Sequence, residues 1–180
     1  MFKQIPVTKV ELELTEACNL QCRFCYNSCE PAYCRNAHTI IDQLERGGVL
    51  ELVLTGGEPS EHPDFFNILR YACERIPRVM VQSNGVNFGR REYFEQLAAE
   101  PVACVNFSLH GLKHTHENLT QIRGSFEATV QAIRWCLAAG VRVASNMVLT
   151  AINSNDTSIK ELVSLHASLG MREMTVTRFI

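Results

Sequence analysis

The chain has 180 residues, of which 46% are hydrophobic and 20% charged, and its formal net charge is −2. This length suits one domain with a sizeable core, and the small net charge produces no large field of the kind that attracts nucleic acid or anionic membranes. We find no secretory signal at the start and no apolar run long enough to span a bilayer. Eight cysteines in such a chain indicate a reducing, cytoplasmic setting.

Strand and helix patterns alternate from the beginning of the sequence to its end. The expected strands are 10–14, 49–54, 79–81, 102–109, 141–149 and 174–180. The expected helices lie near 37–46, 63–72, 93–97, 126–139 and 159–169, and a polar loop is expected between the fourth strand and the fourth helix. Six strands interleaved with five helices predict a parallel α/β sheet, either doubly wound or curved into a partial barrel.

Three cysteines follow the first expected strand within eight residues, at Cys18, Cys22 and Cys25. Thiolates suit zinc, Cu(I) and iron–sulfur clusters. A cubane cluster normally takes four cysteines, so three would leave one iron open for chemistry. Zinc would need a fourth ligand, for which Cys29, Cys34 and His38 are candidates. From spacing alone, zinc and iron–sulfur remain comparable alternatives.

A second motif, Thr55-Gly56-Gly57-Glu58-Pro59, follows the second expected strand. Two glycines allow positive φ or a close backbone approach to a ligand, and Glu58 supplies a carboxylate suited to an ammonium group. Polar motifs also follow the third and fourth strands. In a parallel sheet, ligands gather at the carboxyl ends of the strands, and all of these motifs fall there.

The chain resembles the radical S-adenosylmethionine (SAM) superfamily, in particular its branch of peptide-modifying and molybdenum-cofactor-biosynthesis enzymes. The resemblance covers almost the whole chain. It rests on Cys18-Asn-Leu-Gln-Cys22-Arg-Phe-Cys25-Tyr26, Thr55-Gly56-Gly57-Glu58-Pro59, Gln82-Ser83-Asn84-Gly85, Phe107-Ser108-Leu109-His110-Gly111, His116-Glu117, Gly124-Ser125-Phe126 and Asn146. It implies a partial (β/α)6 TIM-like barrel with parallel strands and outer helices.

The resemblance also implies cofactors and residue roles. Cys18, Cys22 and Cys25 would hold a [4Fe–4S] cluster whose open iron binds SAM. The remaining SAM contacts would be Phe24 beside the adenine, Gly56, Gly57 and Glu58 at the methionyl amine, and Ser83, Asn84, Ser108 and Asn146 at the ribose and carboxylate. No catalytic residue beyond the cofactor ligands is assigned. The expected partners are an external flavodoxin- or ferredoxin-like electron donor and a peptide or small-molecule substrate, with neither membrane nor nucleic acid.

The resemblance also bears on the extent of the domain and on several polar residues outside the motifs. Residues 1–180 would form the core domain, without the final helix and C-terminal auxiliary domain that family members often carry. For His110, His114 and His116, metal binding is not expected, and His116 would order a loop, as in similar sequences. Arg123 and Arg178 could each bind a carboxylate or simply lie at the surface. The alternatives outside the family are a zinc-stabilised binding module and an iron–sulfur electron carrier.

Overall fold

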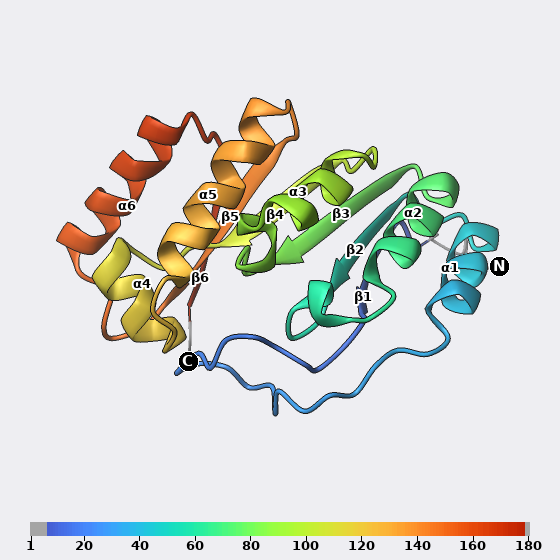
Figure 1. Ribbon diagram of the computed structural model, residues 1–180, viewed down its shortest axis with the longest axis horizontal. Helices are drawn as coiled ribbons and strands as arrows, with labels where there is room; N and C mark the ends of the chain where they lie inside the picture. The colour runs from blue at the N-terminus through green and yellow to red at the C-terminus, as the bar shows by residue number, and fades with distance from the viewer. Residues whose placement is uncertain (1–6, 179–180) are drawn as a thin grey trace, which may run out of the picture.

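A computed structural model of the chain describes residues 7–178 and contains one six-stranded parallel sheet. The strands are β1 Lys9–Glu13, β2 Glu51–Thr55, β3 Arg78–Ser83, β4 Cys104–Ser108, β5 Val143–Leu149 and β6 Met174–Arg178. Their spatial order follows the chain, β1-β2-β3-β4-β5-β6, and each neighbouring pair is parallel. Each crossover therefore connects neighbouring strands in the same direction along the sheet. Because such crossovers are right-handed as a rule, the helices lie on one side of the sheet (Figure 1). The predicted partial barrel is confirmed, and the doubly wound alternative is excluded.

Helices cover the outer face of the half-barrel (Figure 1). The α-helices are α1 Ala37–Arg46, α2 Phe65–Arg75, α3 Arg91–Ala98, α4 Lys113–Thr120, α5 Ser125–Ala138 and α6 Asp156–Leu169, and two short 3₁₀ helices are η1 Pro59–Glu61 and η2 Asn87–Gly89. The prediction of a loop before α5 is wrong, because helix α4 lies there. Its sequence is too polar for an amphipathic pattern, and its buried face contains His116 and Thr120 beside a single large apolar residue, Leu119. Residues 179–180 of the sixth predicted strand lie outside the described residues.

The two faces of the sheet differ in polarity because successive side chains of a strand point to opposite faces. Leu54, Val81 and Phe107, each with no exposed surface, face the helices and form the centre of the core. Toward the carboxyl ends of β3 and β4, the residues that alternate with them are polar: Gln82, Asn106 and Ser108. The register pairs Gln82 with Asn106 on the inner face of the half-barrel. The alternation thus supplies an apolar contact for the helices and a polar inner surface near the carboxyl ends of the strands.

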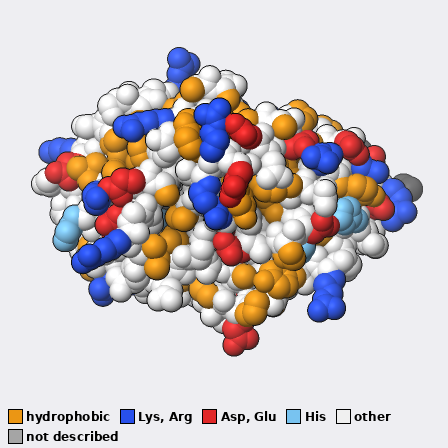
Figure 2. Space-filling view, in the orientation of Figure 1, with side chains coloured by type: hydrophobic (Ala, Val, Ile, Leu, Met, Phe, Trp, Pro, Cys, Tyr) orange, Lys and Arg blue, Asp and Glu red, His pale blue; other side chains and the backbone are white. Residues whose placement is uncertain are grey.

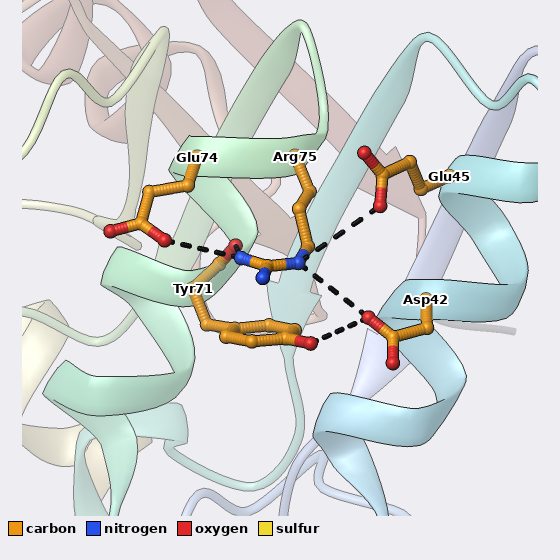
Figure 3. A network of polar contacts seen from close by, with 5 residues as sticks. All are labelled: Asp42, Glu45, Tyr71, Glu74 and Arg75. Carbon is orange, nitrogen blue, oxygen red and sulfur yellow. Dashed lines mark hydrogen bonds and ion pairs between the residues drawn. The ribbon is translucent and has the colours of Figure 1, made fainter.

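Helices α1 and α2 are joined at their outer surface by a network around Arg75 (Figure 3). The guanidinium lies 3.4 Å from the centroid of the Tyr71 ring and 3.5 Å from Asp42. The Tyr71 hydroxyl donates to the same Asp42 carboxylate over 2.6 Å. Glu45 and Glu74 complete the ring of acidic groups, at 3.9 and 3.1 Å. One half-buried cation on α2 therefore links this helix to two carboxylates of α1, those of Asp42 and Glu45.

We expect Arg75→Ala to lower the thermal unfolding midpoint by about 3 °C, since a cation–π contact and several partly screened ion pairs are lost together. Arg70→Ala is the matched control because Arg70 lies on the same helix and, among the residues that the structure describes, its exposed guanidinium makes a single ion pair, with Glu100. Its midpoint should fall by about 1 °C or less. Equal shifts in the two variants, measured by circular dichroism, would contradict a structural role for the network.

The surface is mixed in charge. In Figure 2, blue and red side chains are interspersed with orange ones over the face shown, as expected for a net charge of −2. Among residues 7–178, none of the helices combines the length and apolar character that crossing a membrane requires.

Candidate active site

The segment between β1 and α1 carries the cysteine motif and crosses the inner side of the half-barrel. In Figure 1 it leaves β1, runs toward α4 and the end of β6, and returns to α1. Two backbone hydrogen bonds attach it to the end of α4: the Gln21 amide donates to the Thr120 carbonyl over 3.2 Å, and the Arg23 amide donates to Leu119 over 2.9 Å. Helix α4, which the sequence did not reveal, is therefore one of the two supports of the cysteine segment.

The second support is the glycine pair after β2. The Gly57 amide donates to the Thr15 carbonyl over 2.7 Å, and the Glu58 amide donates to the Ala17 carbonyl over 2.8 Å. A Cβ atom on Gly57 would lie 2.5 Å from the carbonyl oxygens of both Glu16 and Ala17. Gly56 has a φ of +144°, a region that favours glycine. In this structure the glycines are required because the start of the cysteine segment lies directly against them.

These supports enclose a cavity of about 330 Å³ at the carboxyl ends of the strands. Ten of the eleven predicted site residues line it: Cys18, Cys22, Phe24, Cys25, Gly56, Gly57, Ser83, Asn84, Ser108 and Asn146. The eleventh, Glu58, does not. The residues that sequence reasoning did not assign to the site are Leu20, Tyr26, Thr55, Gln82, His110, Val148, Thr177 and Arg178. For Gln82 and Thr177 the signal was available, since strand alternation places them on the same face as Ser108 and Asn146. Arg123 is exposed and does not line the cavity.

The three motif cysteines differ in their surroundings. Cys25 is exposed, whereas burial raises the pKa of the Cys18 and Cys22 thiols to about 12, so both are protonated in the metal-free chain. The Cys18 sulfur accepts from the Leu20 amide over 3.4 Å, and the Cys25 sulfur accepts from the Asn27 amide over 3.4 Å. Metal binding would displace the thiol protons. The two N–H···S hydrogen bonds would then help to orient the Cys18 and Cys25 sulfurs as ligands.

The cavity suits a cluster better than a convergent single-ion site. Within the part of the chain that the structure describes, no three His, Cys, Asp or Glu side chains converge closely enough to hold one metal ion. In a [4Fe–4S] cluster each cysteine binds its own iron, so the thiols need to line a common wall instead of meeting at a point. Cys18, Cys22 and Cys25 do so, and the chemistry of three thiolates fits the cluster. Cys29 and Cys34 are half-buried and do not line the cavity.

Glu58 is fully buried beneath the cavity floor. One carboxylate oxygen accepts from the Ser60 hydroxyl over 2.6 Å, and the other accepts from the backbone amide of Asn84 over 2.7 Å. The Ser83 hydroxyl lies 2.9 and 3.0 Å from the two oxygens. Burial raises the pKa of Glu58, and these hydrogen bonds oppose that effect. Its predicted direct contact with a SAM ammonium group stays a prediction.

His110 forms part of the cavity wall beside Phe24. The two rings meet edge to face with centroids 4.9 Å apart, and His110 stacks on His116 at 5.6 Å. Burial lowers the pKa of His110 to about 3, so the ring is neutral near pH 7. Its Nδ1 accepts from the Val148 amide over 3.2 Å, which assigns the ring proton to Nε2. His116 Nδ1 in turn accepts from the His110 amide over 3.3 Å, so the pair joins α4 to the ends of β4 and β5.

The fold and cavity define a parallel half-barrel with a thiol-lined site at its carboxyl edge. The chain belongs to the radical SAM superfamily of enzymes, whose family model matches residues 12–166.

Curated relatives share this domain. The sporulation killing factor maturation protein SkfB of Bacillus subtilis is 31% identical over 152 residues, which are 82% of this chain and 37% of SkfB. The mycofactocin maturase MftC of Mycobacterium tuberculosis is 35% identical over 147 residues, which are 78% of this chain and 37% of MftC. This chain thus spans well under half the length of these relatives.

A solved structure has the same fold. Streptococcus suis SuiB bound to S-adenosylmethionine superposes with a TM-score of 0.82 at 22% identity, and the match covers 97% of this chain and 39% of SuiB.

Proposed function

We propose that residues 1–180 form the catalytic core of a radical SAM enzyme in which Cys18, Cys22 and Cys25 hold a [4Fe–4S] cluster. The observation that carries this proposal is that the three thiols line the same cavity as the glycine pair and the polar ends of β3, β4 and β5. When bound, the cluster would supply the electron that splits SAM into methionine and a 5′-deoxyadenosyl radical, which removes a hydrogen atom from the substrate. The zinc and electron-carrier alternatives assign no role to the polar wall formed by the ends of β3, β4 and β5.

The remaining cavity residues would bind and orient SAM. Phe24 offers a flat apolar face for the adenine and is held in place by His110. Gly56 and Gly57 would leave their carbonyl groups available to the methionyl amine, with Glu58 directly beneath them. Ser83, Asn84, Ser108 and Asn146 supply hydroxyl and amide groups for the ribose and the methionyl carboxylate. In a wall of this kind the protein binds and orients the cofactor and excludes water from it.

We propose a peptide as the substrate. SkfB is a maturation protein and MftC is a maturase, and SuiB has been solved bound to the precursor peptide SuiA, with a TM-score of 0.85 to this chain. A small molecule is the second candidate, because the Fe-coproporphyrin III synthase of Methanosarcina barkeri is 26% identical over 149 residues. Either substrate would require an external flavodoxin- or ferredoxin-like donor. Thiols that bind an iron–sulfur cluster must stay reduced, which favours the cytoplasm.

The test is anaerobic reconstitution of the chain with iron and sulfide, followed by reduction with dithionite in the presence of SAM. We expect about four irons per chain, a brown protein and formation of 5′-deoxyadenosine measured by chromatography. A colourless protein that binds zinc and cleaves no SAM would support the zinc module. A cluster without 5′-deoxyadenosine would contradict radical chemistry for this chain.

Cys29 and Cys34 provide the test against an iron–sulfur electron carrier, in which one of them would be the fourth cluster ligand. We expect the double variant Cys29→Ala/Cys34→Ala to retain the iron content and 5′-deoxyadenosine yield of the wild type, because neither residue lines the cavity. Iron analysis and the visible absorption spectrum measure the outcome. Loss of the cluster in this variant would favour the carrier, since a carrier needs all four thiolates.

A further inference from the structure

We propose that Glu58 is a positioning residue that acts on Cys18 through Asn84 and does not contact the SAM ammonium group. This inference rests on the proposed function, because it concerns how the cluster ligand Cys18 is held. It departs from the role predicted for Glu58 from the sequence, in which its carboxylate contacts the methionyl amine of SAM directly.

The carboxylate of Glu58 is already saturated by donors from its own surroundings. One oxygen accepts from the Ser60 amide over 3.2 Å and from the Ser60 hydroxyl over 2.6 Å. The other accepts from the backbone amide of Asn84 over 2.7 Å, and the Ser83 hydroxyl lies within hydrogen-bond distance of both oxygens. The side chain has no exposed surface and lies outside the cavity lining. An ammonium group would have to displace at least one of these bonds and reach beneath the cavity floor.

Asn84 carries the connection from Glu58 to the cysteine segment. Its backbone amide is held by Glu58, and its carbonyl oxygen accepts from the Thr129 hydroxyl over 2.7 Å. Its side-chain nitrogen then donates to Asn19 Oδ1 over 2.7 Å and to the Cys18 sulfur over 3.7 Å. Asn84 therefore joins the end of β3 to the first cysteine of the motif, across 66 positions of sequence.

Hydrogen bonds to ligand sulfurs orient the ligand and tune an iron–sulfur centre. A displaced Asn84 side chain would remove one such bond and release Asn19 as well. A variant that displaces Asn84 is therefore expected to hold the cluster less firmly even when SAM is absent.

The experiment compares Glu58→Gln, Asn84→Ala and the double variant, each reconstituted anaerobically. Glutamine matches glutamate in shape, but each carboxylate oxygen faces a backbone amide donor, so the new NH₂ group must oppose either Ser60 or Asn84. Glu61→Gln is the matched control, because among residues 7–178 the Glu61 carboxylate accepts a hydrogen bond from the Asn87 side chain alone, and an amide oxygen can replace it. Glu58→Asp is the second test variant. It keeps the negative charge, but its side chain is one methylene shorter, so the carboxylate no longer reaches the backbone amide of Asn84.

Three properties are measured: iron release to a chelator without SAM, the electron paramagnetic resonance spectrum of the SAM-free reduced cluster, and the Kd for SAM. We expect Glu58→Gln and Asn84→Ala each to speed iron release about tenfold, as for one lost hydrogen bond, and to alter the SAM-free spectrum. The double variant should release iron no faster than the faster single variant, because both changes break one path. The Kd for SAM should stay within about threefold of wild type in Glu58→Gln.

Other outcomes separate the alternatives. A Kd for SAM weakened more than about tenfold in Glu58→Gln, with SAM-free iron release and spectrum unchanged, would overturn the proposal in favour of direct ammonium binding. Multiplying effects in the double variant would overturn the path through Asn84. If Glu58→Gln does not fold, Glu58→Asp is judged by the same three measurements. A wild-type chain that forms no cluster or no 5′-deoxyadenosine contradicts the proposed function itself.

Discussion

Cys22→Ala is expected to abolish both the cluster and the formation of 5′-deoxyadenosine. With three protein ligands for the cluster, removal of one leaves two irons without a thiolate, and two thiolates do not retain a cubane. Cys22 is half-buried and lies outside the hydrophobic core, so the variant should keep the wild-type far-UV circular dichroism spectrum. The measurements are iron and sulfide content after reconstitution and the yield of 5′-deoxyadenosine, which should both fall to background.

Cys73→Ala is the control for this change. Cys73 is also half-buried, but it is part of α2, packs against the hydrophobic core and does not line the cavity, so its variant should bind a full complement of iron. Full iron content in Cys22→Ala would show that the ligand set is wrong and that another thiol, such as Cys29, takes part.

Gly57→Ala is expected to have the second largest effect, on folding and cluster assembly together. The new Cβ would lie 2.5 Å from two carbonyl oxygens, those of Glu16 and Ala17, and neither can move without the cysteine segment. Overpacking against backbone costs about 3 kcal/mol of unfolding free energy. The shift should also break the hydrogen bonds that Gly57 and Glu58 donate to this segment. Urea unfolding measures the stability, and iron content measures the site.

Gly47→Ala is the matched control, because Gly47 has an ordinary helical φ of −76° at the exposed end of α1. Its unfolding free energy should change by about 0.5 kcal/mol or less. If Gly57→Ala were as stable as Gly47→Ala and assembled a full cluster, the close approach of the cysteine segment to the glycines would be contradicted.

The polar helix α4 illustrates where sequence patterns fail. Strands such as β2 and β3 follow from runs of apolar residues that end at glycine or polar motifs, and α2 follows from a regular apolar face. Helix α4 has no such face, since it buries His116 and Thr120 instead of a row of aliphatic side chains. Its position is set by the stacking of His116 on His110 and by the carbonyl groups it offers to Gln21 and Arg23. These contacts join segments that are distant in the sequence, so no local pattern reports them.

The sequence by itself determined the alternation of strands and helices, the spacing of the three thiols and the motifs at the strand ends, because periodicity and motif spacing are local properties. Those motifs were enough to place ten of eleven predicted residues around one cavity. Only the tertiary structure decided what individual groups do there. It shows that Gly57 accommodates the backbone of the cysteine segment and that Glu58 lies beneath the cavity with Ser60, Ser83 and Asn84 as its partners. In the sequence, a carboxylate next to two glycines indicates a ligand-binding residue. The burial of Glu58 and the positions of its hydrogen-bond donors depend on strands that meet only after folding.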